Sequence, residues 1–227
     1  ENNSKRMELI ENIAILLYEE WFIKFKFPDN EKIQLKKSKK GNIPENWEIS
    51  KVSDLIKRLK AGSKYTKDNV QEEGITIVID QSSKEFLGWH SNPADHEAST
   101  EKPIMIFGDH TCKMRILVQP FSVGPNTIPF ISLKYSEIFI YFLIRNLVST
   151  KEYKRHWNEL ISKEVVVPTE QLANDFTQKA TPIFEQITRL AFTNINLIKT
   201  RDILLPRLVH GEIDISKLDI QTPEVEA

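Results

Sequence analysis

Apolar residues recur every three or four positions in two long stretches, one toward each end of the chain. This spacing places them on one face of a helix. The first stretch ends in an aromatic run at residues 21–27, which Pro28 stops. Bulky rings of this kind fill a junction between elements more readily than they stay in water. The apolar stripe of this first helix consists of Ile10, Ile13, Ala14, Leu17 and Trp21.

The second helix, expected from about residue 182 to residue 211, carries apolar residues at alternating steps of four and three, which is typical of a coiled-coil seam. Asn194 is a polar position on this seam, and such a residue fixes register and partner number at a cost in stability. Pro206 should bend the helix, and Gly211 is placed to cap its end. The spacing also fits an ordinary hairpin within the chain. The seam positions are Phe176, Ala180, Ile183, Ile187, Leu190, Asn194, Leu197, Arg201, Leu204 and Leu208.

Between these helices, short strand patterns mix with helical ones without a strict strand–helix–strand repeat, which predicts an α+β fold. Ser53 and Ser136 are suited to cap two of the helices, and Gly62 to end the first of them. The expected elements are a linker at 36–41, a turn into a strand at 43–49, strands at 75–79, 104–107, 114–118 and 164–168, and helices at 52–59, 137–147 and 151–161.

The predicted organisation is one globular domain flanked by long helices that pack as an antiparallel coiled coil. With 227 residues, of which 40% are hydrophobic, the chain can bury one core but hardly two. Its expected parts are a helix at 1–30, the domain at 31–167, a long helix at 168–211 and an acidic tail at 212–227.

Three features indicate a soluble cytoplasmic protein. The longest apolar run, residues 138–144, is stopped by Arg145 and is far shorter than the roughly 20 residues that a membrane helix needs. The single Cys112 has no partner for an internal disulfide, and no signal-peptide pattern precedes it. Because the chain begins at Glu1 rather than Met, we expect a fragment or a processed product.

The net charge of -1 argues weakly against a nucleic-acid partner, but it averages two segments of opposite sign. Residues 31–68 carry eleven Lys or Arg against five Asp or Glu, a balance of +6, whereas residues 212–227 hold five acids and Lys217, a balance of -4. The basic segment fits phosphate binding and a solvated linker equally well, and the acidic one fits a solvated tail.

Catalytic chemistry finds little support in the sequence. Side chains of metal-ligand type lie between residues 90 and 112, but no Cys-x-x-Cys or His-Glu-x-x-His spacing organises them. Glu152 and Lys154 would suit a nuclease, yet they fall in an expected surface helix without an acidic partner. Neither a Gly-x-x-x-x-Gly-Lys loop nor a Gly-x-Gly-x-x-Gly turn occurs. We therefore expect no catalytic residue, no metal and no cofactor in this chain.

Three motifs, in this order, resemble the specificity subunit of type I restriction-modification systems. They are WFIKFKFP at 21–28, IPENWEI at 43–49 and LLPRLVHGEI at 204–213. In that family a spacer helix precedes a target-recognition domain entered through a Pro-x-x-Trp stretch, and a second spacer helix follows. The resemblance covers nearly the whole chain and fits the C-terminal half of a family member or a half-length form that dimerises. Where family members often have Gly-Gly-Thr-Pro after the first short helix, this chain has Ala-Gly-Ser-Lys at 61–64.

The resemblance implies a non-catalytic subunit whose domain reads one half of a bipartite site in double-stranded DNA. Its helices would set the half-site spacing and dock the modification (methyltransferase) subunits. S-adenosylmethionine would then be bound by those subunits, and ATP and Mg²⁺ by restriction subunits, with a second copy of this chain as a further candidate partner. The alternative is a coiled-coil interaction or scaffold module without DNA sequence preference.

The long helix has a length suited to this role. Residues 183–208 would span about 40 Å at about 1.5 Å per residue, close to the roughly 34 to 36 Å between major grooves that face one side of a duplex. Deleting four residues within 187–197 should therefore change the half-site spacing. The residues expected at partner or helix interfaces are Trp21, Phe22, Ile183, Ile187, Leu190, Asn194, Leu197, Leu204 and Leu208.

DNA is contacted mainly by cationic side chains on phosphates and by Arg, Lys, Asn or Gln on base edges. Candidates of this kind gather in three clusters, each of which also fits solvated surface. The first is Lys57, Arg58, Lys60, Lys64, Tyr65 and Lys67, the second is His110, Lys113, Arg115 and Gln119, and the third is Lys151, Lys154 and Arg155.

Overall fold

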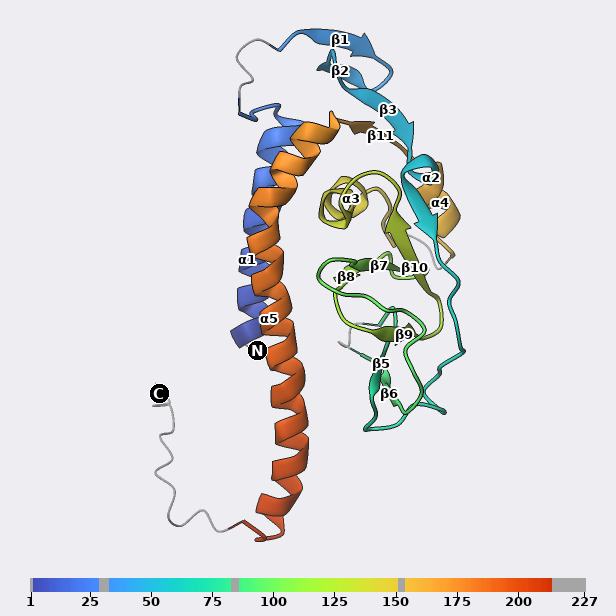
Figure 1. The fold of residues 1–227 in the computed structure, drawn as a ribbon, viewed down its shortest axis with the longest axis vertical. Coiled ribbons are helices and arrows are strands. Elements are labelled where there is room, and N and C mark those ends of the chain that lie inside the picture. The colour runs from blue at the N-terminus through green and yellow to red at the C-terminus, as the bar shows by residue number, and fades with distance from the viewer. Residues whose placement is uncertain (1, 29–32, 83–85, 151–153, 214–227) are drawn as a thin grey trace.

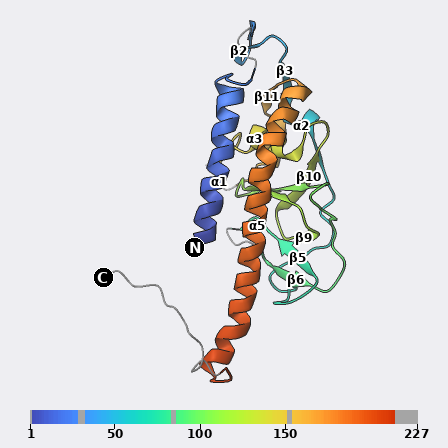
Figure 2. The same cartoon turned by 60° about the vertical axis from the view of Figure 1, so that its left-hand side comes forward.

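Two helices from opposite ends of the chain lie side by side along one edge of the molecule (Figures 1 and 2). The computed structural model describes residues 2–28, 33–82, 86–150 and 154–213. The first helix is α1 (Asn2–Tyr18), which continues into a π-helical turn, η1 (Glu19–Ile23). The second is α5 (Glu170–Val209), a helix of 40 residues.

The two helices run antiparallel. Near the start of α1, Asn3 donates a hydrogen bond from Nδ2 to Oδ1 of Asn194 at 3.0 Å. At the other end, the ring of Tyr18 lies 5.8 Å from that of Phe176, centroid to centroid. Residue numbers thus rise along α1 while those of its partners on α5 fall. Beyond Asn194, α5 extends past the beginning of α1 (Figure 1).

In its described residues, the globular domain between these helices contains four small sheets. The largest is antiparallel, with the strand order β4-β10-β7-β8, and a three-stranded sheet of order β6-β5-β9 lies beyond it. In the latter, β5 pairs antiparallel with β6 and parallel with β9. These strands are β4 (Ile56–Arg58), β5 (Thr76–Ile79), β6 (Gly88–His90), β7 (Ile104–Gly108), β8 (Met114–Leu117), β9 (Phe121–Val123) and β10 (Thr127–Ser132).

The remaining elements join the domain to the helices. A hairpin of β1 and β2 and an antiparallel pair of β3 with β11 stand at the end where α5 begins (Figure 1). Helix α3 packs between the large sheet and α5. The bounds are β1 (Leu35–Ser38), β2 (Gly41–Pro44), β3 (Glu48–Lys51), α2 (Val52–Leu55), α3 (Glu137–Ile144), α4 (Trp157–Ser162) and β11 (Glu164–Val167).

An aromatic cluster fastens both helices to the domain. The ring of Phe22 lies 5.2 Å from Phe139, 5.3 Å from Phe176 and 5.8 Å from Trp47, which come from α3, α5 and the β2–β3 turn. All four side chains are buried in one continuous core. Because aromatic pairs contribute about 0.5–1.5 kcal/mol beyond the apolar area that they bury, this cluster couples the helix pair firmly to the sheet.

A polar contact fixes α1 against α3. Glu11 on α1 accepts a hydrogen bond from the Tyr141 hydroxyl at 2.6 Å and lies 2.8 Å from Nη1 of Arg145. Burial raises the pKa of Tyr141 well above its ordinary value, so the hydroxyl keeps its proton and donates. Charge-assisted bonds of this kind are stronger than neutral ones, and they hold the helix at one rotation.

The α+β class is confirmed, but the first helix differs from its prediction. It runs from Asn2 to Ile23, so it ends before the predicted bound at residue 30 and inside the aromatic run at 21–27. Ile13 is 58% exposed, so it does not belong to the buried stripe. The i to i−5 hydrogen bond from Lys24 N to Glu19 O, characteristic of a π turn, changes the helical phase. Neighbouring rings Trp21 and Phe22 are therefore both buried.

The predicted linker at 36–41 is wrong, because these residues lie in the β1–β2 hairpin. Lys37 pairs with Asn42 and Ser38 with Gly41. Gly41 has a φ of +99°, a conformation that glycine adopts without strain. Ile43 on β2 is buried, which anchors the hairpin while its lysines stay exposed.

The predicted helix at 52–59 is also largely wrong. Only Val52–Leu55 is helical, and Ile56–Arg58 forms β4, which pairs with β10. Ser53 does not cap this helix, since its hydroxyl bonds to Asp54 instead. Gly62 lies in the loop after β4. Pairing with a strand distant in the sequence overrides the local helical pattern.

The other local signals are mostly confirmed. Ser136 caps α3 by accepting from the N–H of Phe139 at 3.1 Å. Gly211 follows α5 with a φ of +69°, and its neighbour Glu212 donates to the carbonyl of Arg207, the arrangement of a Schellman cap. The strands expected near 75–79, 104–107, 114–118 and 164–168 are present as β5, β7, β8 and β11.

Two helix boundaries differ from their predictions. Helix α5 begins at Glu170, capped by Thr169, and contains Pro182 as well as Pro206. Helix α4 begins at Trp157 rather than at residue 151. Lys151, Glu152 and the tail residues 214–227 lie outside the described residues.

Replacing Phe176 with Ala should lower the free energy of unfolding by about 3–5 kcal/mol. It leaves a cavity among the rings that pack against it, which are those of Tyr18, Trp21, Phe22, Phe139 and Phe142. The matched control is Phe192→Ala on the same helix, whose side chain is 37% exposed, and it should cost at least 2 kcal/mol less by the same reasoning. Urea unfolding followed by circular dichroism measures both. Equal losses would show that the aromatic cluster does not hold the helices to the domain.

Candidate nucleic-acid interface

A groove opens on the domain where three segments meet: residues 58–66 after β4, the β9–β10 turn at 123–128, and residues 155–158 at the start of α4. We call it the β4–α4 groove. Its volume is about 640 Å³. Arg58 and Lys64 come from the first segment and Arg155 from the third, and all three side chains are exposed. The groove therefore joins members of two clusters that lie far apart in the sequence.

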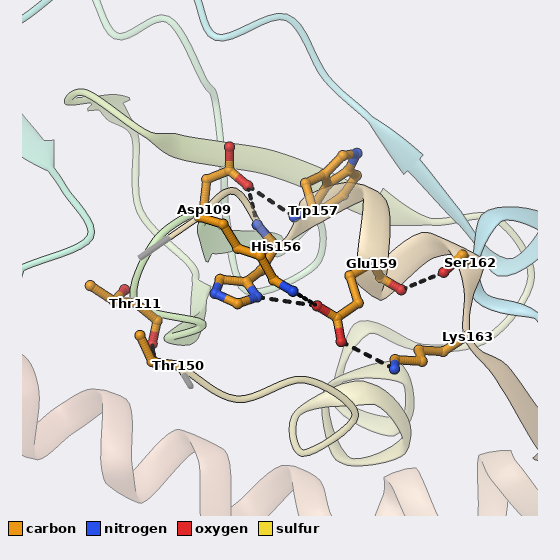
Figure 3. A network of polar contacts seen from close by, with 9 residues as sticks. Asp109, Thr111, Thr150, His156, Trp157, Glu159, Ser162 and Lys163 are labelled. Carbon is orange, nitrogen blue, oxygen red and sulfur yellow. Dashed lines mark hydrogen bonds and ion pairs between the residues drawn. The ribbon is translucent and has the colours of Figure 1, made fainter. Parts of the chain in front are cut away.

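Asp109 holds the start of α4 against the large sheet (Figure 3). Its Oδ1 accepts from the N–H groups of His156 at 3.0 Å and Trp157 at 2.9 Å, and its main-chain carbonyl also accepts from His156 at 2.8 Å. The residue at the N-cap position of α4, His156, makes no side-chain cap itself. A carboxylate from another element therefore performs the capping, which satisfies the free amide groups of the helix end.

The same carboxylate also lies close to Arg155 of the third cluster. Nε of Arg155 lies 3.9 Å from Oδ2 of Asp109. Asp109 is buried, whereas the Arg155 side chain is largely exposed. The main-chain N–H of Asp109 in turn donates to the carbonyl of Asn126 at 2.8 Å. One residue thus ties the α4 wall of the groove to the β9–β10 turn.

A second acid, Glu159, lies within α4 itself and contacts the residues at both ends of this helix (Figure 3). Glu159 lies 3.4 Å from Nδ1 of the buried His156 and 3.2 Å from Nζ of Lys163. The hydrogen bond from Lys163 is the main cause that holds the pKa of Glu159 below its ordinary value. The carboxylate therefore stays ionised near neutral pH and links the two ends of α4.

The wall after β4 is shaped by a stacked pair. Tyr65 is 8% exposed and stacks on His90 with ring centroids 4.0 Å apart. Nε2 of His90 lies 3.0 Å from the Ser122 hydroxyl, and burial lowers the pKa of this histidine. One face of the Tyr65 ring is therefore covered, so this predicted DNA-binding residue supports the wall of the groove.

Gly62 allows the same wall to fold closely on the domain. It has a φ of +84°, and a Cβ built on it would lie 2.4 Å from Cγ of Asp95. The main-chain N–H of Ser63 donates to that carboxylate at 3.1 Å. A larger residue at position 62 would push the loop away from Asp95. This close approach explains why the Ala-Gly-Ser-Lys stretch at 61–64 has glycine at its second position.

The structure does not bring all the candidate residues together. Lys57, Lys60 and Lys67 are exposed but do not line the groove. Lys113, Arg115 and Gln119 instead line a separate cavity of about 360 Å³ between β8 and α5. In the β7–β8 turn, the N–H of His110 donates to Gln81 at 2.9 Å. Lys154 lies 3.5 Å from Glu159 and lines a third, smaller cavity.

Three groove residues were missed by the sequence analysis: Asp109 as a brace, and the exposed amides Asn126 and Asn158. A signal existed for Asn126, because Gly-Pro-Asn at 124–126 is a turn sequence. Asn126 indeed has a φ of 55°. No local signal marks Asn158, whose place in the groove follows from where Asp109 fixes α4.

The predicted interface residues divide into two groups along the helices. Trp21, Phe22 and Leu190 are buried within the chain, and Ile183 and Ile187 are half-buried on α5. Asn194 forms the hydrogen bond with Asn3 described above. On the part of α5 beyond α1, by contrast, the three leucines of the predicted seam are exposed. They are Leu197, Leu204 and Leu208.

Two features of the described residues bear on other classes of function. In the described part of the chain, no three His, Cys, Asp or Glu side chains gather closely enough to hold a metal ion. His90 and His96, which are of metal-ligand type, instead face Tyr65 and the carbonyl of Ala61. Within the same described ranges, no helix has the length and apolarity to cross a bilayer.

Comparison with known proteins supports the resemblance seen in the sequence. The chain is 26% identical over 243 aligned residues to the type I restriction enzyme MjaIX specificity subunit of Methanocaldococcus jannaschii, an alignment that covers 96% of this chain. It covers 56% of the relative, so the chain spans little more than half of that protein's length. No protein-family model matches the chain.

A solved structure shares the fold of this chain. The crystal structure of the type I restriction-modification S subunit from M. genitalium matches with a TM-score of 0.57 and 14% identity, over 91% of this chain and 54% of that one. The HsdS subunit from Thermoanaerobacter tengcongensis matches at 12% identity over 93% of this chain and 53% of its own, with a TM-score of 0.47. The chain thus has the fold of the first of these and is similar to type I specificity subunits over almost its whole length.

Replacing Asp109 with Ala should cost about 1–2 kcal/mol of the free energy of unfolding, because it removes the acceptor of two N–H groups at the start of α4. Asp109→Asn is the matched control, since its side-chain oxygen still accepts, and it should cost less than half as much by that reasoning. Urea unfolding of both variants measures the difference. Equal losses would mean that the charge of Asp109, rather than its capping of α4, is what the fold requires.

Proposed function

We propose that this chain is a DNA sequence-specificity subunit of a type I restriction-modification complex, whose domain reads one half of a bipartite site. The observation that carries the proposal is the β4–α4 groove, where Arg58, Lys64 and Arg155 surround exposed amides. Cations suit phosphates, and amides suit base edges. The 26% identity to a specificity subunit over 96% of the chain supports this function over a scaffold without DNA preference.

The helices would set the distance between the two halves of the DNA site. Helix α5 has 40 residues, a length of about 60 Å at about 1.5 Å per residue, which exceeds the roughly 34 to 36 Å between grooves on one side of a duplex. Its exposed seam at Leu197, Leu204 and Leu208 would complete an antiparallel coiled coil with a helix that this chain does not contain. That helix would come from the other half of a longer subunit or from a second copy.

The chemistry would belong to partner subunits in the cytoplasm. The modification subunits would dock on the helices and bind S-adenosylmethionine, and the restriction subunits would use ATP and Mg²⁺. This chain would act as a non-catalytic subunit. Its groove supports such a division, because it places cations and amides around one buried carboxylate that is engaged in capping α4.

The double variant Lys64→Ala/Arg155→Ala should bind duplex DNA at least tenfold more weakly at about 100 mM salt, because two phosphate-binding cations are lost. The plot of log affinity against log salt should also become shallower by about 1–2. Fluorescence anisotropy with a labelled duplex over a salt series measures both quantities.

A charge-matched control is the double variant Lys36→Ala/Lys37→Ala on the exposed β1 strand. It loses the same charge outside the groove and should change the affinity less than threefold, because long-range effects of exposed charges are screened. If both double variants weaken binding equally, net charge rather than the groove governs DNA binding. Absence of any DNA affinity in the parent chain would reject the proposal.

Removing residues 200–206 should bring the two parts of the recognised site closer by about three base pairs, since seven residues correspond to about 10 Å of helix. This deletion lies beyond Asn194, so it leaves the α1 pairing intact, and seven residues preserve the coiled-coil phase. Sequencing the DNA motif methylated by the assembled complex measures the spacing. Arg201→Ala is the full-length control. An unchanged half-site spacing after the deletion would show that the length of α5 does not set that spacing.

A further inference from the structure

We propose that Asn158 and Asn126 are the base-reading side chains of the β4–α4 groove and that they recognise adenine. The inference rests on the proposed function and assigns the recognition of specific bases in the DNA to two residues. Both amides are exposed and line the groove. They come from different elements, Asn158 from the first turn of α4 and Asn126 from the β9–β10 turn.

The hydrogen-bonding capacity of both amides is unused within the described residues. No protein group there bonds to either side-chain amide. Some other asparagines are engaged within the chain: Asn69 accepts from the N–H of Thr66 and donates to the carbonyl of Lys64, and Asn3 pairs with Asn194. Asn126 and Asn158 therefore have donors and acceptors left for a ligand.

Asp109 holds the two amides in a fixed relation. Its side chain caps the turn that carries Asn158, through the N–H groups of His156 and Trp157. Its main-chain N–H bonds to the carbonyl of Asn126 at 2.8 Å. Because one buried residue positions both backbones, the main chain that carries each amide needs little ordering on binding, and preorganised groups discriminate better between ligands.

Adenine is the base whose edge matches an amide. In the major groove it offers N7 as an acceptor and the N6 amino group as a donor, and an Asn amide bonds to both at once. Guanine offers two acceptors there and suits Arg or Lys instead. The cations of the groove, Arg58, Lys64 and Arg155, are then available for phosphates on either side of the bases that are read.

The test compares sequence preference in Asn158→Ala and Asn126→Gly. Glycine is chosen at 126 because the φ of 55° would strain an alanine. The full chain selects duplexes from a randomised pool, and the affinity for the selected duplex is then compared with that for duplexes carrying one changed base pair. Each variant should lose about tenfold of its discrimination at an A·T pair. The salt dependence should stay unchanged, because no charge is removed.

Asn42→Ala removes an exposed amide from the β1–β2 hairpin and is the matched control, which should keep the parent's preference at every position. The inference is overturned if either groove variant keeps that preference, or if it weakens binding to all sequences equally. A parent chain that binds DNA without any preference would reject the proposed function itself. Unchanged urea unfolding midpoints would confirm that both variants are folded.

Discussion

The burial of Phe22 against Phe139 and Phe176 is the constraint on which the rest of the structure depends. These three rings come from the end of the first helix, the centre of the domain and the start of the last helix. Through their contact, the helix pair and the sheet share one core. Since protein interiors are close-packed and transmit displacement, the direction of α5 is set by the same packing that places the sheet.

The groove depends on this core indirectly. Its walls are loops, but each loop is fastened to a buried group. Asp109 fixes the α4 wall, and the Tyr65–His90 pair supports the wall after β4. Exposed loops that are held at a few buried points combine accessible side chains with a defined geometry, which is the general arrangement of binding sites on rigid scaffolds.

Local sequence signals predicted those features whose causes are local. The caps at Ser136 and Gly211 depend only on neighbouring residues, and both were found. The strand at Ile56–Arg58 was missed because it exists through pairing with β10, a partner about seventy residues away along the chain. For the same reason, Arg58 and Arg155 belong to separate clusters along the sequence. Asp109 and the pairing of β4 with β10 bring both residues to one groove. The mixture of strand and helix patterns predicted the fold class, and the resemblance to specificity subunits carried no information on which side chains meet.

The β9–β10 turn and the first turn of α4 have a consequence for how such a protein can diversify. The side chains of Asn126 and Asn158 point away from the core and bond to none of the described residues. Exchanges at exposed positions of this kind usually alter folding free energy by less than about 0.5 kcal/mol. Under the function proposed above, exchanges at these two positions would change the bases that are recognised while leaving the scaffold unchanged.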